Sequence, residues 1–483
     1  MNYRNVTYAL SLIMMIIGLS MLFPALWSFY YGEIEAWAFL LSSGAVFLVS
    51  LIAYKTTEMG DHLLIKEVYC IVSLAWLLAS FFGALPYLIT GTFTSFTDAF
   101  FETMSGFTTT GASVLSDVEN LPRGILFWRS MTCWLGGMGI IVLFVALLAT
   151  LGTGGEKMFQ AESPGASMVR KFKPRISDAA KVLWRTYLLL TAGGTVGLYL
   201  LGMPLFDALC HSFGCVSTGG ISTKNAGLGF YDQAGIQWAV TILMYLSGAN
   251  FALYYLSWRD KTPRPFFRDS EFRVYTYLIL LAVILIGFNL TTQTGAALED
   301  TIRPAVFHVV SFLTTTGYVA ADYTTWPLFS TLLLMLLMLS GACAGSTSGG
   351  MKIDRMLVMF KQSVLTLRHH LHPRAVFPLK LDHRVMEQEK IMAILQFFFL
   401  YIIIVMGGTL LMAAQGLDLA SAFTAVAASI SNSGVGLGQV GPGLGYGFLS
   451  SAGKYFLAFL MLLGRLELFT VLVLLLPAFW RRD

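Results

Sequence analysis

Four short segments of the 483-residue chain end in a glycine and are rich in side-chain oxygen atoms. They are Thr109-Thr110-Gly111, Thr218-Gly219-Gly220, Thr315-Thr316-Gly317 and Asn432-Ser433-Gly434. None contains a charged side chain, so the ligands they offer are carbonyl and side-chain oxygens. Such neutral oxygens can replace the water shell of a monovalent cation without binding it too strongly to leave. Glycine tolerates positive φ, which lets successive carbonyl groups point toward one axis. These residues favour transient cation coordination, and we call them the filter segments.

A semi-apolar stretch precedes each filter segment and shares one register with the other three. The stretches start thirteen residues before the glycine, at Asp98, Asp207, Pro304 and Ser421, and alanine follows each start directly. These residue types are common where helices begin, and we expect Asp98 and Asp207 to be N-caps. A helix of about eight to ten residues is only ~12–15 Å long, roughly half of the ~30 Å hydrocarbon core. We therefore expect four re-entrant half-helices, each followed by a loop.

The composition places these half-helices in a membrane. Only 12% of the residues are charged and 56% are hydrophobic, whereas soluble domains carry about 25% charged residues. Ten long apolar segments lie at about 6–30, 36–54, 68–90, 125–150, 184–203, 237–257, 273–292, 327–349, 391–414 and 453–479. Non-helical backbone at membrane depth survives only if it is buried in protein or lines a water-filled cavity. The sequence thus predicts an all-α polytopic membrane protein, with four helix, half-helix, helix repeats around a central pore.

The same pattern divides the chain into five parts. Residues 1–60 are expected to form an additional N-terminal hairpin of two spans. The four pore repeats are expected at 61–155, 156–262, 263–380 and 381–483.

The third repeat contains a run of small residues after its second apolar segment. The run includes Gly341, Gly345, Ser346, Thr347, Ser348, Gly349 and Gly350. Each glycine disfavours a helix by about 1 kcal/mol relative to alanine, and the hydroxyl groups offer competing hydrogen bonds. We expect an interrupted helix and a flexible loop beneath the filter segments. A close helix-packing face is the alternative interpretation.

Arg465 lies about twelve residues into the last apolar segment, which begins at about residue 453. An ionisable residue at membrane depth is costly and indicates a functional site. Glu467 is two positions away and would not face it on a helix. We expect Arg465 to contact the carbonyl groups of the 341–350 loop or the ion cavity, and a structural pair with a carboxylate is the alternative.

Glu102, His211 and His308 share one register, nine residues before their filter glycines. Hydrogen bonding that supports each half-helix is the favoured interpretation. Direct contact with the ion is the alternative, which the depth of these residues disfavours.

Other patterns in the sequence carry no function of their own. Residues 436–441 match G-x-G-x-x-G, but no strand precedes them. His369, His370 and His372 lie in a basic loop without cysteine or carboxylate partners at ligand spacing. A net charge of +4 excludes a strongly basic nucleic-acid-binding protein. No group of residues resembles an enzyme active site, so catalysis is not expected. Because the net charge is small, a nucleic-acid partner is not expected either.

Taken together, these features resemble the Trk/Ktr/HKT superfamily of potassium transporters over essentially the whole chain, and most of all its TrkH branch. The resemblance rests on the four repeats, the N-terminal pair of spans, and the sequences at 108–112, 341–350 and 464–467. It implies that potassium is the substrate and that residues 341–350 form an intramembrane gating loop, with Arg465 below the filter. It also implies that the filter glycines are Gly111, Gly220, Gly317 and Gly434.

The resemblance has further implications for selectivity and partners. Sodium-carrying plant members have serine at the first filter glycine, so Gly111 favours potassium. The pair Gly220-Ile221 and the fourth segment depart slightly from the common pattern, but both keep the glycine. The resemblance implies a homodimer and a cytoplasmic, TrkA-like regulatory subunit that binds NAD(H) or ATP. This chain itself is expected to carry no covalent cofactor.

The distribution of charge predicts an orientation. Segments 1–6, 55–67, 151–185, 258–273, 350–390 and 481–483 share one side and carry a net charge of +11, whereas the opposite side carries −7. By the positive-inside rule the basic side is cytoplasmic, with both termini, in a bacterial inner membrane. The filter would then open outward under a negative rim that concentrates cations.

A secondary active symporter coupled to H⁺ or Na⁺ is the alternative function. Such proteins usually have inverted repeats and broken helices. The repeats here are parallel and fourfold, and Glu467 is the only acidic residue deep in an apolar segment.

Overall fold

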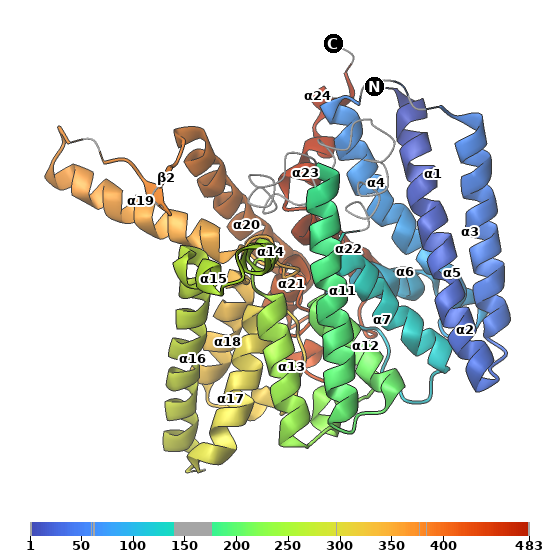
Figure 1. Ribbon diagram of the computed structural model, residues 1–483, viewed down its shortest axis with the longest axis horizontal. Helices are drawn as coiled ribbons and strands as arrows, with labels where there is room; N and C mark the ends of the chain where they lie inside the picture. Colours follow the sequence, from blue (N-terminus) through green and yellow to red (C-terminus); the bar gives the residue numbers. More distant parts are fainter. Residues whose placement is uncertain are drawn as a thin grey trace.

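The computed structural model describes residues 2–58, 60, 63–139, 176–295, 297–375, 377–382 and 384–481. Within these residues one hairpin of strands is present, in which β1 (Lys380–Leu381) pairs antiparallel with β2 (Arg384–Val385). All other regular elements of the described chain are helices (Figure 1). The second half of the apolar run 125–150 and the expected boundary between residues 155 and 156 lie outside the described residues.

Three helices form an N-terminal layer at one side of the molecule (Figure 1). They are α1 (Tyr3–Ser20), α2 (Leu22–Tyr31) and α3 (Ala36–Thr56). α1 packs along both α3 and α4 (Ile65–Gly83). Gly18 permits the close approach of α3, because Ser43 Oγ donates a 2.7 Å hydrogen bond to its carbonyl oxygen.

The remaining helices form four units of the same order. The first contains α4, α5 (Leu85–Ile89), α6 (Phe96–Phe107) and α7 (Arg123–Gly137). The second contains α11 (Ile176–Leu200), α12 (Leu205–Val216), η2 (Gly227–Phe230), α13 (Ala234–Ser247) and α14 (Phe251–Asp260). The third contains α15 (Arg264–Arg268), α16 (Ser270–Thr294), α17 (Leu298–Leu313), η3 (Tyr323–Thr325), α18 (Leu328–Ser340) and α19 (Ile353–Leu371). The fourth contains α20 (Gln388–Ala414), α21 (Leu419–Ile430), η4 (Gly438–Val440), α22 (Ser451–Arg465), α23 (Phe469–Leu472), η5 (Val473–Leu475) and α24 (Pro477–Trp480).

Among the described residues, five helical stretches are long and apolar enough to cross a membrane. They are 3–31, 36–56, 65–89, 270–294 and 388–414. Two bent helix pairs would bring the number to seven if each pair is one span. The architecture confirms the expected all-helical, multi-span membrane fold with re-entrant segments.

The half-helices are α6, α12, α17 and α21, and each one ends directly before a filter segment. α6, α12 and α21 have twelve residues each, too short to cross a hydrocarbon core. Their N-caps are Ser95, Pro204 and Asp418. The expectation that Asp98 and Asp207 are N-caps is therefore wrong. Both lie in the first helical turn, where a carboxylate still interacts favourably with the positive end of the helix.

The third half-helix is longer than the sequence predicts. α17 has sixteen residues and contains Pro304 in its interior, rather than beginning there. The helix is already established before the proline, because Thr301 N–H donates to the carbonyl oxygen of Ala297 at 3.2 Å. Pro304 therefore only removes one donor from an existing helix.

Two apolar runs that the sequence predicts as continuous are broken. The run 237–257 bends by 89° between α13 and α14, where Asn250 caps the new helix by accepting from Ala252 N–H at 2.9 Å. The run 453–479 bends by 116° between α22 and α23, where Glu467 and Leu468 both adopt positive φ. Arg465 consequently ends a helix instead of lying in the middle of one.

The run 341–350 is not helical, in agreement with its glycine and hydroxyl content. α18 ends at Ser340, and the chain resumes a helix only at Ile353. Gly341, Gly345 and Gly350 have φ values of 69°, 77° and 75°, a region that side chains disfavour. We call residues 341–352 the intramembrane loop.

Small residues let the second helix of a repeat touch the end of its half-helix. A Cβ at Gly136 of α7 would overlap the carbonyl oxygen of Phe107, the last residue of α6. A Cβ at Gly464 of α22 would likewise overlap the carbonyl oxygen of Ile430, the last residue of α21. This contact fixes the position at which the first and fourth filter segments begin.

Gly136→Ala tests this packing. Alanine normally stabilises a helix interior by about 1 kcal/mol relative to glycine, but here its Cβ would meet backbone atoms that cannot retreat. We expect a lower melting temperature for the detergent-solubilised variant, corresponding to about 1–3 kcal/mol of overpacking. Gly407→Ala in α20 is the matched control, because no atom lies within 4 Å of its Cβ position. Equal melting temperatures for the two variants would contradict the packing.

Candidate functional site

The four filter segments share one backbone conformation. The first residue of each has a φ between 53° and 56°, at Thr109, Thr218, Thr315 and Asn432. The final glycine of each has a φ between 61° and 78°, at Gly111, Gly220, Gly317 and Gly434. The residue between them does not have positive φ. The middle residue, in the right-handed or extended region, thus lies between two residues in the left-handed region. This alternation aligns successive N–H groups on one side of the backbone and carbonyl groups on the other.

The N–H groups of the filter segments turn back to their own half-helices. In each repeat the middle residue and the glycine both donate to one carbonyl oxygen, six residues before the glycine. The middle N–H lies at 2.8–2.9 Å and the glycine N–H at 3.4–3.5 Å from the acceptors Ser105, Gly214, Ser311 and Ala428. Because the donors are used on this side, the carbonyl oxygens of the filter segments face away from the half-helices.

The filter segments form a closed ring. A Cβ added to each filter glycine would overlap the carbonyl oxygen of the residue before the next repeat's glycine. The pairs are Gly111 with Gly219, Gly220 with Thr316, Gly317 with Ser433, and Gly434 with Thr110. The contacts run in chain order and close from the fourth repeat back to the first. The sequence-predicted filter residues are therefore brought together from all four repeats around one axis.

Hydroxyl groups stabilise the filter segments from within. Thr108 and Thr110 share a 2.9 Å hydrogen bond between their Oγ1 atoms, and Thr314 and Thr316 share one of 2.8 Å. The fourth repeat differs, because Asn432 Nδ2 donates to Thr110 Oγ1 at 3.1 Å. This bond joins the fourth filter segment to the first.

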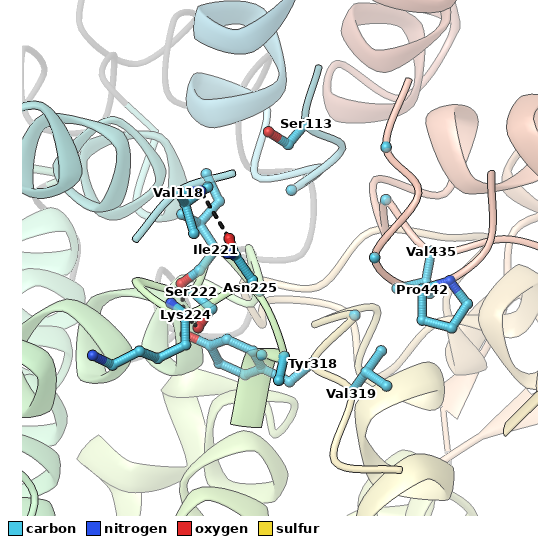
Figure 2. Close-up of a pocket in the computed structure, with 18 of the residues that line it drawn as sticks. Ser113, Val118, Ile221, Ser222, Lys224, Asn225, Tyr318, Val319, Val435 and Pro442 are labelled. Atoms are coloured by element: carbon cyan, nitrogen blue, oxygen red, sulfur yellow. Dashed lines mark hydrogen bonds between the residues drawn. The ribbon is translucent and has the colours of Figure 1, made fainter. Parts of the chain in front are cut away.

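A cavity of about 470 Å³ lies at the glycine end of the ring. All four filter glycines line it, and the loops that follow them form its wall (Figure 2). Its charged lining residues are Arg129, Lys224 and Asp322. Hydrogen bonds from Asn225 and Asn120 hold the pKa of the nearby loop residue Asp117 below its ordinary value, so this carboxylate is ionised at neutral pH.

The cavity loops are joined to one another across the repeats. Loop one meets loop two where Val118 N–H donates to Asn225 Oδ1 at 2.8 Å (Figure 2). The other three junctions are hydrogen bonds of 2.6–3.0 Å, from Leu228 N–H to Val319 O, Tyr323 Oη to Gly436 O, and Tyr446 N–H to Ser113 O. The loops thus form a second ring that encloses the first.

Of the residues in the shared register behind the filter, Glu102 and His211 contact the loops, and His308 contacts its own half-helix. Glu102 accepts from Ser113 Oγ at 3.0 Å and Val114 N–H at 3.0 Å. His211 Nε2 lies 3.0 Å from Ser222 Oγ, and His308 Nδ1 lies 2.8 Å from the carbonyl oxygen of Pro304. All three are buried away from the ring, as the interpretation of them as supporting groups predicts.

The fourth repeat has no polar residue in that register, and its support was not evident from the sequence. Thr424 Oγ1 accepts from Leu437 N–H at 2.9 Å, and Ser421 Oγ accepts from Gln439 N–H at 2.8 Å. These hydroxyls sit one and four positions earlier than Ala425, the register position. Only the hydroxyl content of 421–424 could have suggested them.

The intramembrane loop contacts the end of the filter that is opposite the cavity. Gly349 N–H donates to Thr315 Oγ1 at 2.7 Å, and Thr347 Oγ1 donates to the carbonyl oxygen of Val216 at 3.0 Å. A Cβ at Gly349 would overlap the carbonyl oxygen of Ser431. The loop therefore contacts the second, third and fourth repeats at or just before the first residue of each filter segment.

Arg465 connects the same loop to the first repeat. Its Nη1 donates to Thr347 O at 3.1 Å and to Thr109 Oγ1 at 3.3 Å. Its Nη2 donates to the carbonyl oxygens of Gly136 and Gly137 at 2.6 and 2.9 Å. The side chain thus lies between the filter, the intramembrane loop and the end of α7, among the partners that the sequence led us to expect.

A group of buried charges below the intramembrane loop was missed by sequence reasoning. Lys352 belongs to segment 350–390, which the charge distribution places on the cytoplasmic side, but it is buried and its Nζ donates to Ser348 O. Glu467 forms an ion pair with Arg355, and Glu271 accepts from Ala344 N–H at 2.5 Å. The signal in the sequence was the charged stretch directly after the small-residue run, together with an acidic residue deep in the last apolar segment.

The discounted patterns do not form sites. Residues 436–441 contain only the short helix η4 and no strand. His369, His370 and His372 are exposed at the end of α19. Within the described part of the chain, no group of three His, Cys, Asp or Glu residues could hold a metal ion.

Comparison with known proteins agrees with this geometry. The TrkH family, described as a cation transport protein, matches residues 40–482. The Trk system potassium uptake protein TrkH of Escherichia coli (strain K12) is 37% identical over 487 residues, which cover both chains completely. The TrkH protein of Salmonella typhimurium is also 37% identical with full coverage. The crystal structure of the potassium transporter TrkH from Vibrio parahaemolyticus matches with a TM-score of 0.90 at 35% identity, again over both whole chains.

The resemblance inferred from the repeats and motifs is confirmed by a family match over most of the chain and by full-length relatives above 30% identity. A transport protein, rather than an enzyme, is the class to which these relatives belong. The chain belongs to the TrkH family of cation transport proteins.

Proposed function

We propose that this chain takes up potassium across the bacterial cytoplasmic membrane through the ring of four filter segments. The observation that carries the proposal is the closed ring, in which each filter glycine abuts a carbonyl oxygen of the next repeat. Neutral oxygens in a rigid ring suit a dehydrated monovalent cation. The C-terminal ends of the four half-helices point to the ring, and their partial negative charge favours cations over anions. The names of the full-length relatives support potassium as this cation.

The intramembrane loop and Arg465 form the gate in this proposal. The loop is tied to the end of the filter opposite the cavity by the bonds from Gly349 to Thr315 and from Thr347 to Val216. Arg465 holds its positive charge next to the hydroxyl oxygen of Thr109. This charge repels a cation that leaves the filter. Conduction therefore requires the loop and the guanidinium group to move aside together.

The filter mouth faces outward and both termini are cytoplasmic in this proposal. Both chain ends lie at the same end of the molecule (Figure 1), as the ten apolar segments of the sequence would require if each crosses the membrane once. The basic side of the sequence includes both termini, which supports a cytoplasmic position by the positive-inside rule. The charged residues that line the cavity are two cations and one anion. Attraction of cations to the mouth therefore depends on carbonyl oxygens and on carboxylates farther out, such as Asp117.

A cytoplasmic, TrkA-like subunit that binds NAD(H) or ATP is the regulatory partner in this proposal, and the chain acts as a homodimer. Both assignments rest on the family resemblance. α19 extends away from the other helices (Figure 1) and begins at the intramembrane loop, where Ile353 N–H donates to Ala342 O at 3.1 Å. A partner that displaces α19 would therefore pull directly on the gate.

Flux measurements in liposomes test the proposal against ion-coupled symport. We expect the purified protein to admit K⁺ down its gradient, with little Na⁺ flux, and a protonophore should leave the K⁺ flux intact when the membrane potential is clamped. Uptake that requires a proton or sodium gradient would establish the symporter instead.

Gly434→Ser tests the filter assignment. Serine at φ 69° is strained, and its Cβ would overlap the carbonyl oxygen of Thr110 in the adjacent repeat. We expect the K⁺/Na⁺ permeability ratio to fall about tenfold, because carbonyl positions determine discrimination. Gly416→Ser is the control, since this glycine also has positive φ but has no atom within 4 Å of its Cβ position. An unchanged ratio for Gly434→Ser would remove this residue from the filter.

Arg465→Ala tests the gate. Removal of the guanidinium frees Thr109 Oγ1 and Thr347 O together, so we expect several-fold faster K⁺ flux in the absence of any partner. Arg303→Ala, which removes an exposed arginine paired with Asp232, should leave the flux at the wild-type rate. Equal flux for the two variants would argue against a gating role for Arg465.

A further inference from the structure

Glu102 and Arg129 form a buried ion pair beside the filter that the gate and the ring do not account for. Arg129 Nε lies 2.9 Å from Glu102 Oε1, and the two side chains are 3% and 1% exposed. Charged groups are rarely buried to this extent unless each is fully paired. Burial of both charges is costly, so their presence next to the filter indicates that the pair has a specific role.

The pair is shared between the first and second cavity loops. Glu102 accepts from Ser113 Oγ and Val114 N–H, which lie two and three residues beyond the filter glycine of repeat one. Arg129 donates through Nη2 to Ser113 Oγ at 3.2 Å and through Nη1 to the carbonyl oxygen of Ser222 at 3.4 Å. Ser222 lies two residues beyond the filter glycine of repeat two.

The clamped residues flank one junction of the filter ring. Gly111 abuts the carbonyl oxygen of Gly219 at this junction, and Arg129, Ser113 and Ser222 all line the cavity next to it. Arg129 is therefore a short bridge across the outer side of the contact between the first two filter segments.

In the register position of Glu102, the other repeats carry His211, His308 and Ala425 instead of a carboxylate. Repeat two uses His211 to contact Ser222 Oγ, and repeat four uses the hydroxyl of Thr424. Within the described residues, the ion pair between this register position and the second helix of the repeat is found in the first repeat. Charge-assisted hydrogen bonds are shorter and stronger than neutral ones, so the Glu102–Arg129 pair holds this junction firmly.

We propose that Glu102 and Arg129 are positioning residues that fix the spacing between the first and second filter segments, and that this spacing sets the discrimination of K⁺ from Na⁺. The inference rests on the proposed role of the ring as a potassium filter. Na⁺ is the smaller ion, so a ring that can relax inward at one junction coordinates it better. A fixed junction denies Na⁺ that relaxation.

The test measures the K⁺/Na⁺ permeability ratio of purified variants in liposomes. Ser113→Ala removes the hydroxyl that both partners share and leaves no buried charge unpaired. The double variant Glu102→Gln/Arg129→Gln keeps polar groups in place and the net charge at zero. We expect the ratio to fall about threefold or more in the double variant and less in Ser113→Ala, because Ser113→Ala keeps the ion pair and the bond from Arg129 to Ser222 O.

Glu67→Gln is the matched control. Glu67 is equally buried, at 1% exposed, and accepts from Asn2 N–H, Asn5 Nδ2 and Leu64 N–H, none of which belongs to a pore repeat's filter or loop. The K⁺/Na⁺ permeability ratio of Glu67→Gln should match that of the wild type. Elution profiles and melting temperatures identify folded protein, and if the double variant does not fold, Ser113→Ala decides alone.

The outcomes separate this inference from the proposed function. A wild-type protein without K⁺ preference would overturn the potassium filter itself. A selective wild type, with an unchanged ratio in folded Ser113→Ala and the double variant, would overturn only the clamp. A fall in Glu67→Gln as well would show that any buried carboxylate affects the ratio, and would also overturn the specific role of this pair.

Discussion

The structure depends on one constraint, which is that backbone N–H and carbonyl groups cannot be left without partners inside a membrane. The filter segments meet it asymmetrically, because their N–H groups bond back to the half-helices while their carbonyl oxygens remain available to an ion. This arrangement needs alternating positive φ, a half-helix to accept the donors, and a neighbouring repeat to hold each glycine. The half-helices, the cavity loops and the small residues of the flanking helices all serve these three needs.

The same constraint explains where charge is found at depth. Arg465 has no place in lipid, but three carbonyl oxygens and a hydroxyl group accept its hydrogen bonds. Those acceptors belong to the first repeat and the intramembrane loop, so the arginine joins parts of the chain that are far apart in sequence. In the proposed function, the contacts that stabilise this buried charge also close the ion path, so a change in one is expected to change the other.

Sequence reasoning was accurate where the repeats provided four copies of the same evidence. The register of Asp98, Asp207, Pro304 and Ser421 identified the half-helices, although the helices begin two to six residues earlier. Helix ends were misjudged because residue preferences at caps are weak compared with the packing of the whole repeat. The breaks at Asn250 and Glu467 were missed because apolar runs on both sides conceal a turn whose partners come from other segments.

By itself, the sequence determined the membrane environment, the four repeats, the filter segments and the interrupted helix at 341–350, because these follow from composition and local backbone preference. Only the tertiary structure decided which atoms meet across repeats. The order of the ring, the ties of Arg465 to Thr109 and Thr347, and the pairs Arg355–Glu467 and Glu102–Arg129 all join residues that are distant in the chain. Such contacts depend on how the helices pack, and no local pattern encodes them.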